Sequence, residues 1–537
     1  MEKSVKYNMD EEKQKDTYGK VPDPVTAGVL EEFAAFCRFP HGSGNEGQIA
    51  EYLAERLRKA GFCPEIDGTG NLICDIPAVR GCEHAPLTVL QGHMDMVCAA
   101  TDDSYRPETD SICWTLEEDP AGGGLFLRSD GRSSLGADCG LGNAVLIWTI
   151  FSGGCKHGPL RLLLTTEEEI GLAGAKKVDA SVFDDVRYVI NVDGFHWGRL
   201  VAGSASGSRE TYTAKAAGIC LGSGRSGRSG GKAVSDATER REDLIAFEIC
   251  LKDFQSGHSG YDIARGRANA IRLLNSLLRE LMDRKILLYL AAYHGGCGHN
   301  VIPGDASAVA VIRKEDQLAF QESVRELMDR ILRKYGESDP DGRLCYNEIA
   351  LPEYVMARED GERLVNFIGT VHDGVLHWME DLPGIPDTSS NMGMVRCCVR
   401  ETEAGAENEI RVMTFARSMT PEYHDEVLRE HRLAAEKYGF CDDISEYGVW
   451  RYDPANPLIR LMKEACRRVT GKEPEVTAEH VGLEPSVFCG KADHLYMINI
   501  GADIIDPHTV HERVRVDTIR PFALTMTEVL SMIGMER

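Results

Sequence analysis

The chain has 537 residues, of which 43% are hydrophobic, and a formal net charge of −25 at neutral pH. A chain of this length is too long for a single hydrophobic core, so two or more lobes are expected. The negative charge argues against a nucleic acid as partner, because a surface that binds nucleic acid must neutralise phosphates. No apolar run approaches the ~20 residues that a membrane helix needs.

The amino-terminal residues 1–20 are polar and charged, unlike a secretory signal sequence, and residues before about Val25 are expected to form a mobile extension. The 17 cysteines are scattered and include no CxxC pair. Cysteines used in this way are typical of reduced thiols. We therefore expect a cytoplasmic protein with no membrane partner.

The first part of the chain alternates predicted helices and strands, as an α/β layer requires. Residues 103–133 are rich in turn formers and are predicted to be irregular. Helical patterns cover Val29–Phe36 and the segment with Ile49, Leu53 and Leu57, and predicted strands cover Asn71–Asp75, Pro86–Leu90, Arg161–Thr166 and Arg187–Val192.

His93 and Asp95 follow the predicted strand Pro86–Leu90. Side chains two residues apart on an extended backbone point the same way. A carboxylate beside an imidazole can accept the second ring N–H and make the other nitrogen a better metal ligand. A core histidine capped by a turn aspartate is an equally good interpretation of this stretch alone.

Acidic side chains follow other apolar runs. Glu167–Glu169 come after one predicted strand, Asp193 after another, and His508 shortly after Leu495–Ile500. Sites of open parallel sheets lie outside the carboxyl ends of the strands, and carboxylates gathered there repel one another unless cations neutralise them. One of two adjacent glutamates can bind metal while its neighbour accepts a proton from water, although most charge runs are solvated faces.

Asp138 lies in the glycine-rich segment Leu135–Asn143, just before an apolar helix predicted to begin near Ala144. Glycines allow a close approach of backbone and metal, and an aspartate there can offer both carboxylate oxygens. Taken alone, an N-cap of the following helix is the simpler interpretation of Asp138.

The pattern changes from about Ser208, which suggests a separate α+β lobe inserted into the first domain. The low-complexity segment Gly222–Lys232 is predicted to be a flexible surface loop. The chain is expected to return to the first domain near Asp453, giving predicted divisions of 1–207, 208–452 and 453–537. The lobe has predicted strands at Leu244–Leu251, Ile286–Ala292, Ala306–Ile312 and Glu409–Phe415 and predicted helices at Ala268–Arg284 and Gln317–Tyr335, and Leu458–Val469 after it is also predicted to be helical.

An ordered set of short motifs covers almost the whole chain and resembles the M20 metallopeptidases, most closely their Xaa-His dipeptidase branch. The motifs are Arg38–Glu46, Gly92–Val97, Leu135–Asp138, Thr166–Gly171, Asn191–Asp193, Gly257–Gly260, Gly266–Ala270, Ala416–Ser418, His480–Glu484 and His508–Val514.

The resemblance implies a zinc-peptidase-like α/β catalytic domain, with a mixed sheet flanked by helices, and an inserted α+β lid. It implies two divalent metal ions, zinc with manganese or cobalt as alternatives, one held by His93, Asp138 and Asp193 and the other by Asp138, Glu169 and His508. By the same resemblance Glu168 would be the general base, although local spacing alone does not distinguish it from Glu167. Asp95 would be the partner of His93.

In the lid, the resemblance assigns His258 to the oxyanion, Asn300 and Arg417 to holding a small peptide, and Gly482 to lining the pocket through its backbone. An Arg417 guanidinium is suited to a bidentate grip on the terminal carboxylate. A homodimer through the lid is a further expectation, and His258 could serve its own chain or a partner's.

Three positions depart from the family pattern. Cys139 stands where asparagine is usual, and its thiol could add a ligand or simply pack. Gly194 replaces a hydroxyl residue and could loosen Asp193. On chemistry alone either His508 or His511 could ligate, and His508 is favoured because its spacing to Glu512 matches the family.

Three functions stay open from the sequence: a dipeptidase, an aminoacylase or deacylase of the same architecture, and a non-catalytic homologue that binds peptide or metal. The full ligand set with Glu168 argues against the last. The remaining histidines, His294, His299, His424 and His480, are interpreted as hydrogen-bonded or exposed residues without a ligand role.

Overall fold

The computed structural model describes residues 21, 23–101, 105–119, 122–151, 154–221, 240–399 and 407–536. The predicted loop Gly222–Lys232 and residues 1–20 of the predicted extension lie outside the described residues. The chain forms two compact units, which comprise the described residues of Met1–Ser204, Trp450–Ala478 and Leu483–Arg537 and those of Ala205–Val449 and Glu479–Gly482. The second unit is therefore inserted in the sequence of the first.

The first unit is built on an eight-stranded mixed sheet with the strand order β1-β2-β6-β3-β7-β22-β8-β21. The central pairs β6–β3, β3–β7 and β7–β22 are parallel, whereas β1–β2, β2–β6 and β22–β8 are antiparallel. The strands are β1 (Glu65–Ile66), β2 (Leu72–Ile76), β3 (Leu87–His93), β6 (Leu160–Thr165), β7 (Val186–Asn191), β8 (Arg199–Ser204), β21 (Glu475–Glu479) and β22 (Tyr496–Asn499).

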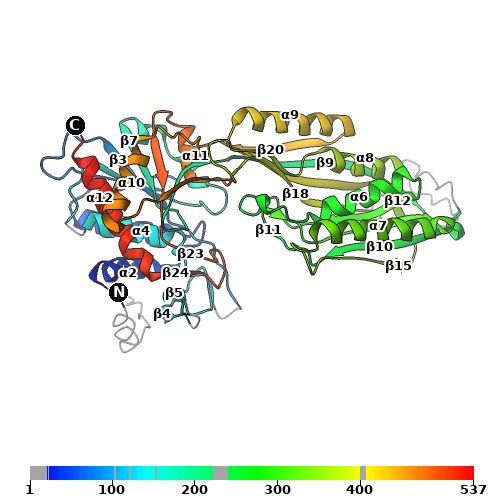
Figure 1. Ribbon diagram of the computed structural model, residues 1–537, viewed down its shortest axis with the longest axis horizontal. Helices are drawn as coiled ribbons and strands as arrows, with labels where there is room; N and C mark the ends of the chain where they lie inside the picture. The colour runs from blue at the N-terminus through cyan, green and yellow to red at the C-terminus, as the bar shows by residue number, and fades with distance from the viewer. Residues whose placement is uncertain are drawn as a thin grey trace. The chain divides into compact units, whose positions relative to one another are not determined.

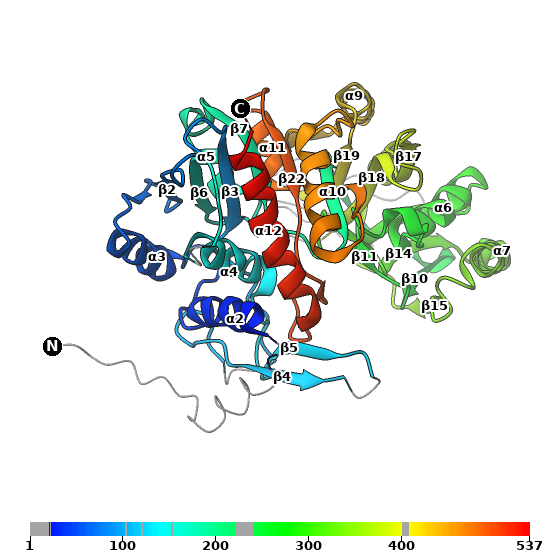
Figure 2. The same ribbon diagram turned by 60° about the vertical axis from the view of Figure 1, so that its left-hand side comes forward.

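Helices cover this sheet, and Figure 2 shows α4, α10 and α12 in front of its strands. The consecutive residues Leu162–Leu164 of β6 are fully buried, so both faces of the sheet are covered at this strand, which explains why β6 reads as a continuous apolar run. The helices are α2 (Pro24–Cys37), α3 (Gly47–Lys59), α4 (Ala137–Phe151), α5 (Ala173–Lys177), α10 (Pro457–Thr470), α11 (Glu484–Cys489) and α12 (Ile519–Gly534).

The prediction that residues 103–133 are irregular is wrong in part. This segment contains the hairpin of β4 (Trp114–Glu118) and β5 (Leu125–Ser129), which joins β23 (Ile504–Ile505) and β24 (Arg513–Arg515) in a small antiparallel sheet. Each strand of the hairpin has only five residues, so its pattern is too short to stand out beside turn-forming glycines. The other predicted helices and strands of this unit are confirmed, although α2 begins at Pro24 instead of Val29 and α4 at Ala137 instead of Ala144.

The second unit is an antiparallel sheet with the main strand order β15-β10-β14-β12-β18-β19-β9-β16, to which β17 and β20 add at β18 and β9 (Figure 1). Its strands are β9 (Ser206–Cys220), β10 (Leu244–Lys252), β12 (Leu287–Gly295), β14 (Ala306–Arg313), β15 (Arg343–Ile349), β16 (Tyr354–Met356), β17 (Gly374–Trp378), β18 (Pro386–Cys398), β19 (Glu407–Ser418) and β20 (Cys441–Tyr447).

A two-stranded sheet, β11 (Gly257–His258) with β13 (Val301–Ile302), completes the strands of this unit, and its helices are α6 (Ala270–Asp283), α7 (Gln317–Tyr335), α8 (Arg358–Thr370) and α9 (Pro421–Tyr438). Its apolar core is separate from that of the first unit. Runs of antiparallel strands with helices packed on them are an α+β arrangement, so this prediction is confirmed. None of the helices in the described part of the chain is long and apolar enough to cross a membrane.

Candidate metal centre

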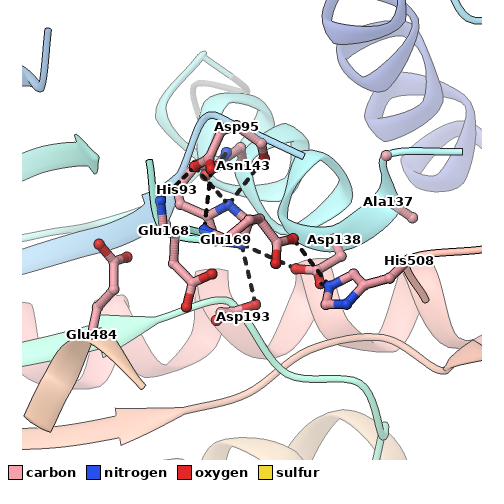
Figure 3. A network of polar contacts seen from close by, with 12 residues as sticks. His93, Asp95, Ala137, Asp138, Asn143, Glu168, Glu169, Asp193, Glu484 and His508 are labelled. Carbon is pink, nitrogen blue, oxygen red and sulfur yellow. Dashed lines mark hydrogen bonds and ion pairs between the residues drawn. The ribbon is translucent and has the colours of Figure 1, made fainter. Parts of the chain in front are cut away.

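A cluster of acidic and imidazole side chains lies at the carboxyl edge of the parallel strands of the first unit (Figure 3). His93 is the last residue of β3, Glu169 follows β6, and Asp193 follows β7. Parallel strands end at the same edge, so three segments far apart in the sequence meet there. Asp138 at the start of α4 and His508 in the loop after β23 complete the cluster.

Asp138 is at the centre of the cluster. Its Oδ1 lies 3.0 Å from His93 Nε2 and its Oδ2 lies 2.8 Å from His508 Nε2. Both carboxylate oxygens face imidazoles, and the described contacts include no hydrogen bond to this carboxylate from a main-chain N–H of α4, so it does not cap the helix. The N-cap interpretation of Asp138 is wrong, and the two oxygens face different imidazoles as a bridging ligand must.

The other contacts link the remaining members. His93 Nε2 lies 3.5 Å from Asp193 Oδ1, and His508 Nε2 lies 3.1 Å from Glu169 Oε1. His508 is thus part of the cluster although its side chain is 44% exposed, whereas the described contacts of His511 are made by its main chain, whose N–H donates to Thr509 Oγ1. The structure therefore separates the two histidines that chemistry alone left open.

The protonation of the cluster shows the effect of crowding charges. Burial opposes charge on both imidazoles, but carboxylate contacts outweigh it: they raise the pKa of His93, and Asp138 and Glu169 raise the pKa of His508 to about 11. Burial raises the pKa of Asp193, and the nearby Asp138 charge raises it further. Cations are therefore needed here, as protons or as metal ions.

The donor set fits metal ions. Side-chain atoms of His93, Asp138 and Glu169 lie within 4.8 Å of one another, and so do those of His93, Cys139 and Asp193. Glu169 Oε1 and Asp193 Oδ1 are buried and have no hydrogen bond of normal geometry besides their ion-pair contacts with His508 and His93. Buried carboxylate oxygens without such hydrogen bonds are costly, and imidazole with carboxylate is a common zinc ligand set.

Asp95 holds the loop that carries the glutamates. Its Oδ1 accepts a hydrogen bond from the Glu168 N–H at 2.9 Å, its Oδ2 accepts from the Glu169 N–H at 3.2 Å, and Ser43 Oγ donates to the same Oδ2 at 2.8 Å. His93 Nδ1 lies 3.0 Å from the main-chain carbonyl of Asp95 and 3.4 Å from its Oδ1. The expected partner of His93 therefore also positions both glutamates.

Two further carboxylates hold the main chain of the cluster, and no local pattern of the sequence indicates either. Glu46 directly precedes α3, and its Oε1 accepts hydrogen bonds from the N–H groups of Gly44 and Glu167, both at 3.0 Å. Glu512 accepts from four consecutive N–H groups, those of Leu135–Asp138, at 2.8 to 3.2 Å. Both glutamates belong to motifs that carried the family resemblance.

Glu168 adjoins the ligands but makes none of their contacts. Figure 3 shows its carboxylate near Asp193, on the side of Glu484. Burial raises its pKa, and the charges of Glu169, Asp193 and Glu484 raise it further. Glu484 is fully buried, and Gln91 Nε2 donates to its Oε2.

Gly194 is required by close packing. A Cβ built there would lie 2.6 Å from Gly501 N. The Asp193 carbonyl accepts a hydrogen bond from Asn499 Nδ2 at 3.2 Å, so the main chain at this ligand is held without a hydroxyl side chain.

The predicted substrate-holding residues gather in the second unit. Arg417 is buried, with Nη1 donating to Tyr447 Oη at 3.0 Å and Nη2 to Ser259 Oγ at 3.5 Å, and its Nε has no partner. Among the described residues no carboxylate forms an ion pair with Arg417. Gly482 adjoins this group, because a Cβ there would lie 2.5 Å from the Tyr447 ring.

His258 and Asn300 lie on the same part of this unit. His258 Nδ1 accepts hydrogen bonds from Gly260 N at 3.1 Å and Tyr261 N at 3.3 Å. Those two donors assign the ring proton of the neutral imidazole to Nε2. Asn300 is exposed, and its carbonyl accepts from Ser259 N at 2.8 Å.

Two of the remaining histidines are hydrogen-bonded in the core, as expected. His480 Nε2 pairs with Ser389 Oγ at 2.7 Å, and His424 Nε2 pairs with Ser208 Oγ at 3.1 Å.

The chain is similar to known proteins over most of its length. The sequence model of peptidase family M20/M25/M40 matches residues 89–532. The cytosol non-specific dipeptidase of Escherichia coli (strain K12) is 26% identical over 510 residues, which are 93% of this chain and 96% of that protein.

Solved structures agree with this result. The crystal structure of aminoacylhistidine dipeptidase from Vibrio alginolyticus has a TM-score of 0.78 at 26% identity and covers 96% of this chain and 97% of that one. Aminopeptidase PepT from Bacillus cereus ATCC 10987 has a TM-score of 0.54 at 15% identity, with 95% and 98% covered, and shares the fold.

Proposed function

Because this chain belongs to peptidase family M20/M25/M40 and is a hydrolase of peptide bonds, we propose that it is a metal-dependent dipeptidase. Its substrates would be Xaa-His or a broader range of dipeptides with a free carboxyl terminus. Two similar proteins support this range, an aminoacylhistidine dipeptidase and a non-specific dipeptidase. We also propose a cytoplasmic location, as for the cytosol dipeptidase, and a homodimer through residues 208–452.

The observation that carries the proposal is the cluster around Asp138, whose two oxygens face different imidazoles. His93, Asp138 and Asp193 would hold one divalent ion, and Asp138, Glu169 and His508 a second, with zinc preferred and manganese or cobalt as alternatives. Bound ions of this kind lower the pKa of water and polarise a carbonyl.

Glu168 is proposed as the general base. Its carboxylate is beside the cluster without sharing the ligand contacts, and its main-chain N–H is fixed by Asp95. A glutamate whose pKa is raised by burial can take a proton from water on one oxygen and give it to the leaving amine nitrogen. Glu168 is proposed over Glu167 on the family pattern, and the two differ in that the Glu167 N–H is bound by Glu46 and not by Asp95.

The second unit would bind the peptide. A buried guanidinium without a carboxylate partner among the described residues favours an anionic ligand, so Arg417 is proposed to bind the terminal carboxylate. The Nε2 proton of His258 makes this nitrogen a donor suited to the oxyanion. Asn300 would hold the peptide, and Gly482 would leave room for backbone contact.

The test is amino acid release from a panel of Xaa-His, β-Ala-His, Gly-Gly and their N-acetyl forms. Chelated protein is reloaded with zinc or manganese and compared with Glu168→Gln. We expect metal-dependent cleavage of the free-amino dipeptides, lowered by about 10²–10⁴-fold in the variant while metal binding is kept. Cleavage of the acetylated forms only would make the protein a deacylase, and no turnover with metal bound would make it a binding homologue.

A further inference from the structure

We propose that Cys139 is a ligand of the metal ion held by His93 and Asp193, so that this centre contains a thiolate. The inference rests on the proposed metal dependence and adds a property of this chain, because asparagine is usual at this position in the family it resembles. The alternative is that the thiol binds no metal and only packs in the core.

The first observation is geometric. Cys139 Sγ, a nitrogen of His93 and a carboxylate oxygen of Asp193 all lie within 4.8 Å of one another, and all three residues are buried. Zinc bonds of about 2.0–2.3 Å put the ligand atoms of one ion within about 4.6 Å of each other. The three atoms are therefore close to the spacing that a single ion requires.

The second observation is a poorly satisfied carboxylate oxygen on the same side. Asp193 is 7% exposed, and its buried Oδ1 has no hydrogen bond of normal geometry. Its ion-pair contact with His93 Nε2 is long, at 3.5 Å. A desolvated acceptor and a thiol that face the same imidazole favour a shared cation over simple packing.

The third observation concerns the space for the sulfur atom. Gly92 precedes His93, and a Cβ built on it would lie 3.1 Å from Cys139 Sγ and 2.3 Å from Asn143 Oδ1. Asn143 Nδ2 in turn donates to the His93 carbonyl at 2.6 Å. The missing side chain at Gly92 therefore leaves room for the thiol beside the main chain of a metal ligand.

A coordinated thiol is bound as thiolate, and its proton passes to solvent when the metal–sulfur bond forms. Thiolate is a soft ligand that favours zinc over manganese, whereas imidazole and carboxylate alone accept both. The structure thus assigns to Cys139 a role in metal preference.

The experiment replaces zinc with cobalt(II) in the full chain and records the absorption spectrum. Wild-type protein should show a near-ultraviolet thiolate-to-cobalt charge-transfer band in addition to the visible cobalt bands. The first band should disappear in Cys139→Ser and Cys139→Asn, whereas the visible bands remain. Cys155→Ser is the matched control, because Cys155 is also a buried thiol of this unit and its Sγ donates to the Thr527 carbonyl.

A second readout needs no variant. The X-ray absorption spectrum of the wild-type zinc protein should show a sulfur neighbour of zinc at about 2.3 Å.

A third readout is metal preference. The preference for zinc over manganese should fall at least about tenfold in Cys139→Asn, since mutation of residues that only support the ligands already lowers metal affinity by this factor.

Visible cobalt bands without a charge-transfer band, or a charge-transfer band that survives in both Cys139 variants, would overturn the inference and leave the metal centre intact. No cobalt spectrum at all would overturn the proposed metal dependence and the inference with it. The two failures are therefore distinguishable.

Discussion

Replacement of Glu512 by glutamine tests whether this residue holds Asp138, the proposed bridging ligand, in place. The carboxylate accepts four hydrogen bonds from the main chain of Leu135–Asp138, two on each oxygen. A glutamine keeps one acceptor oxygen and turns an NH₂ group towards the other two N–H donors. Two buried donors then lose their acceptor and face another donor.

The magnitude follows from these two lost bonds. A hydrogen bond to a charged group contributes about 1.5–3 kcal/mol, so the loss is about 3–6 kcal/mol. Burial and the Asp138 charge raise the pKa of Glu512 to about 7, which means that they disfavour its charged form. A neutral glutamine avoids this penalty, so part of the stability lost with the two hydrogen bonds is regained. At a pH above that value we expect the free energy of unfolding to fall by about 3 kcal/mol.

The assay is urea unfolding of the chelated protein, followed by a metal titration of the folded variant. Metal affinity should fall about 10–100-fold, because the hydrogen bond from the Asp138 main-chain N–H to Glu512 no longer holds Asp138 in place. The control is Glu464→Gln, whose carboxylate binds only Arg467 and Arg468 on an exposed helix face and whose loss should change neither quantity. Unchanged stability and metal affinity in Glu512→Gln would refute the reasoning.

Three further predictions concern Glu484, His508 and Arg417. Burial raises the pKa of Glu484 from its usual 4.5 to about 7, so the folded state binds the proton more tightly and the wild-type protein loses stability as the pH rises between these values. Glu484→Gln should remove up to about 3 kcal/mol of this loss. If the free energies of unfolding of the two chelated proteins change equally with pH across that range, this prediction is wrong. His508→Ala should lower the number of tightly bound metal ions measured by metal analysis whereas His511→Ala should not, and equal metal contents would exclude His508 as ligand. Arg417→Lys should raise KM for dipeptides about 10–100-fold with kcat retained, since a bidentate contact is lost, and Tyr447→Phe should raise KM less; a fall in kcat alone would argue against carboxylate binding.

Several parts of the fold follow from the sequence because their signals are local. Apolar runs such as Leu162–Leu164 lie in strands buried on both faces, and strands of this kind show themselves without any knowledge of their neighbours. The strand β18 shows the opposite case. Its buried Thr388, Ser389 and Asn391 look like a loop in the sequence, because their hydrogen-bond partners come from distant segments, Ser418, His480 and residues 299–301.

The sequence by itself determined which residues were candidates, since histidine and carboxylates at the ends of apolar runs belong to one edge of a parallel sheet. Only the tertiary structure decided how they act together: it turned Asp138 away from helix capping, brought in His508 and left out His511. It also placed Glu512 on four N–H groups that precede it by about 375 residues and Cys139 beside Asp193. Such contacts depend on the packing of segments that no local pattern connects, because pairing between residues far apart is fixed only when the whole core forms.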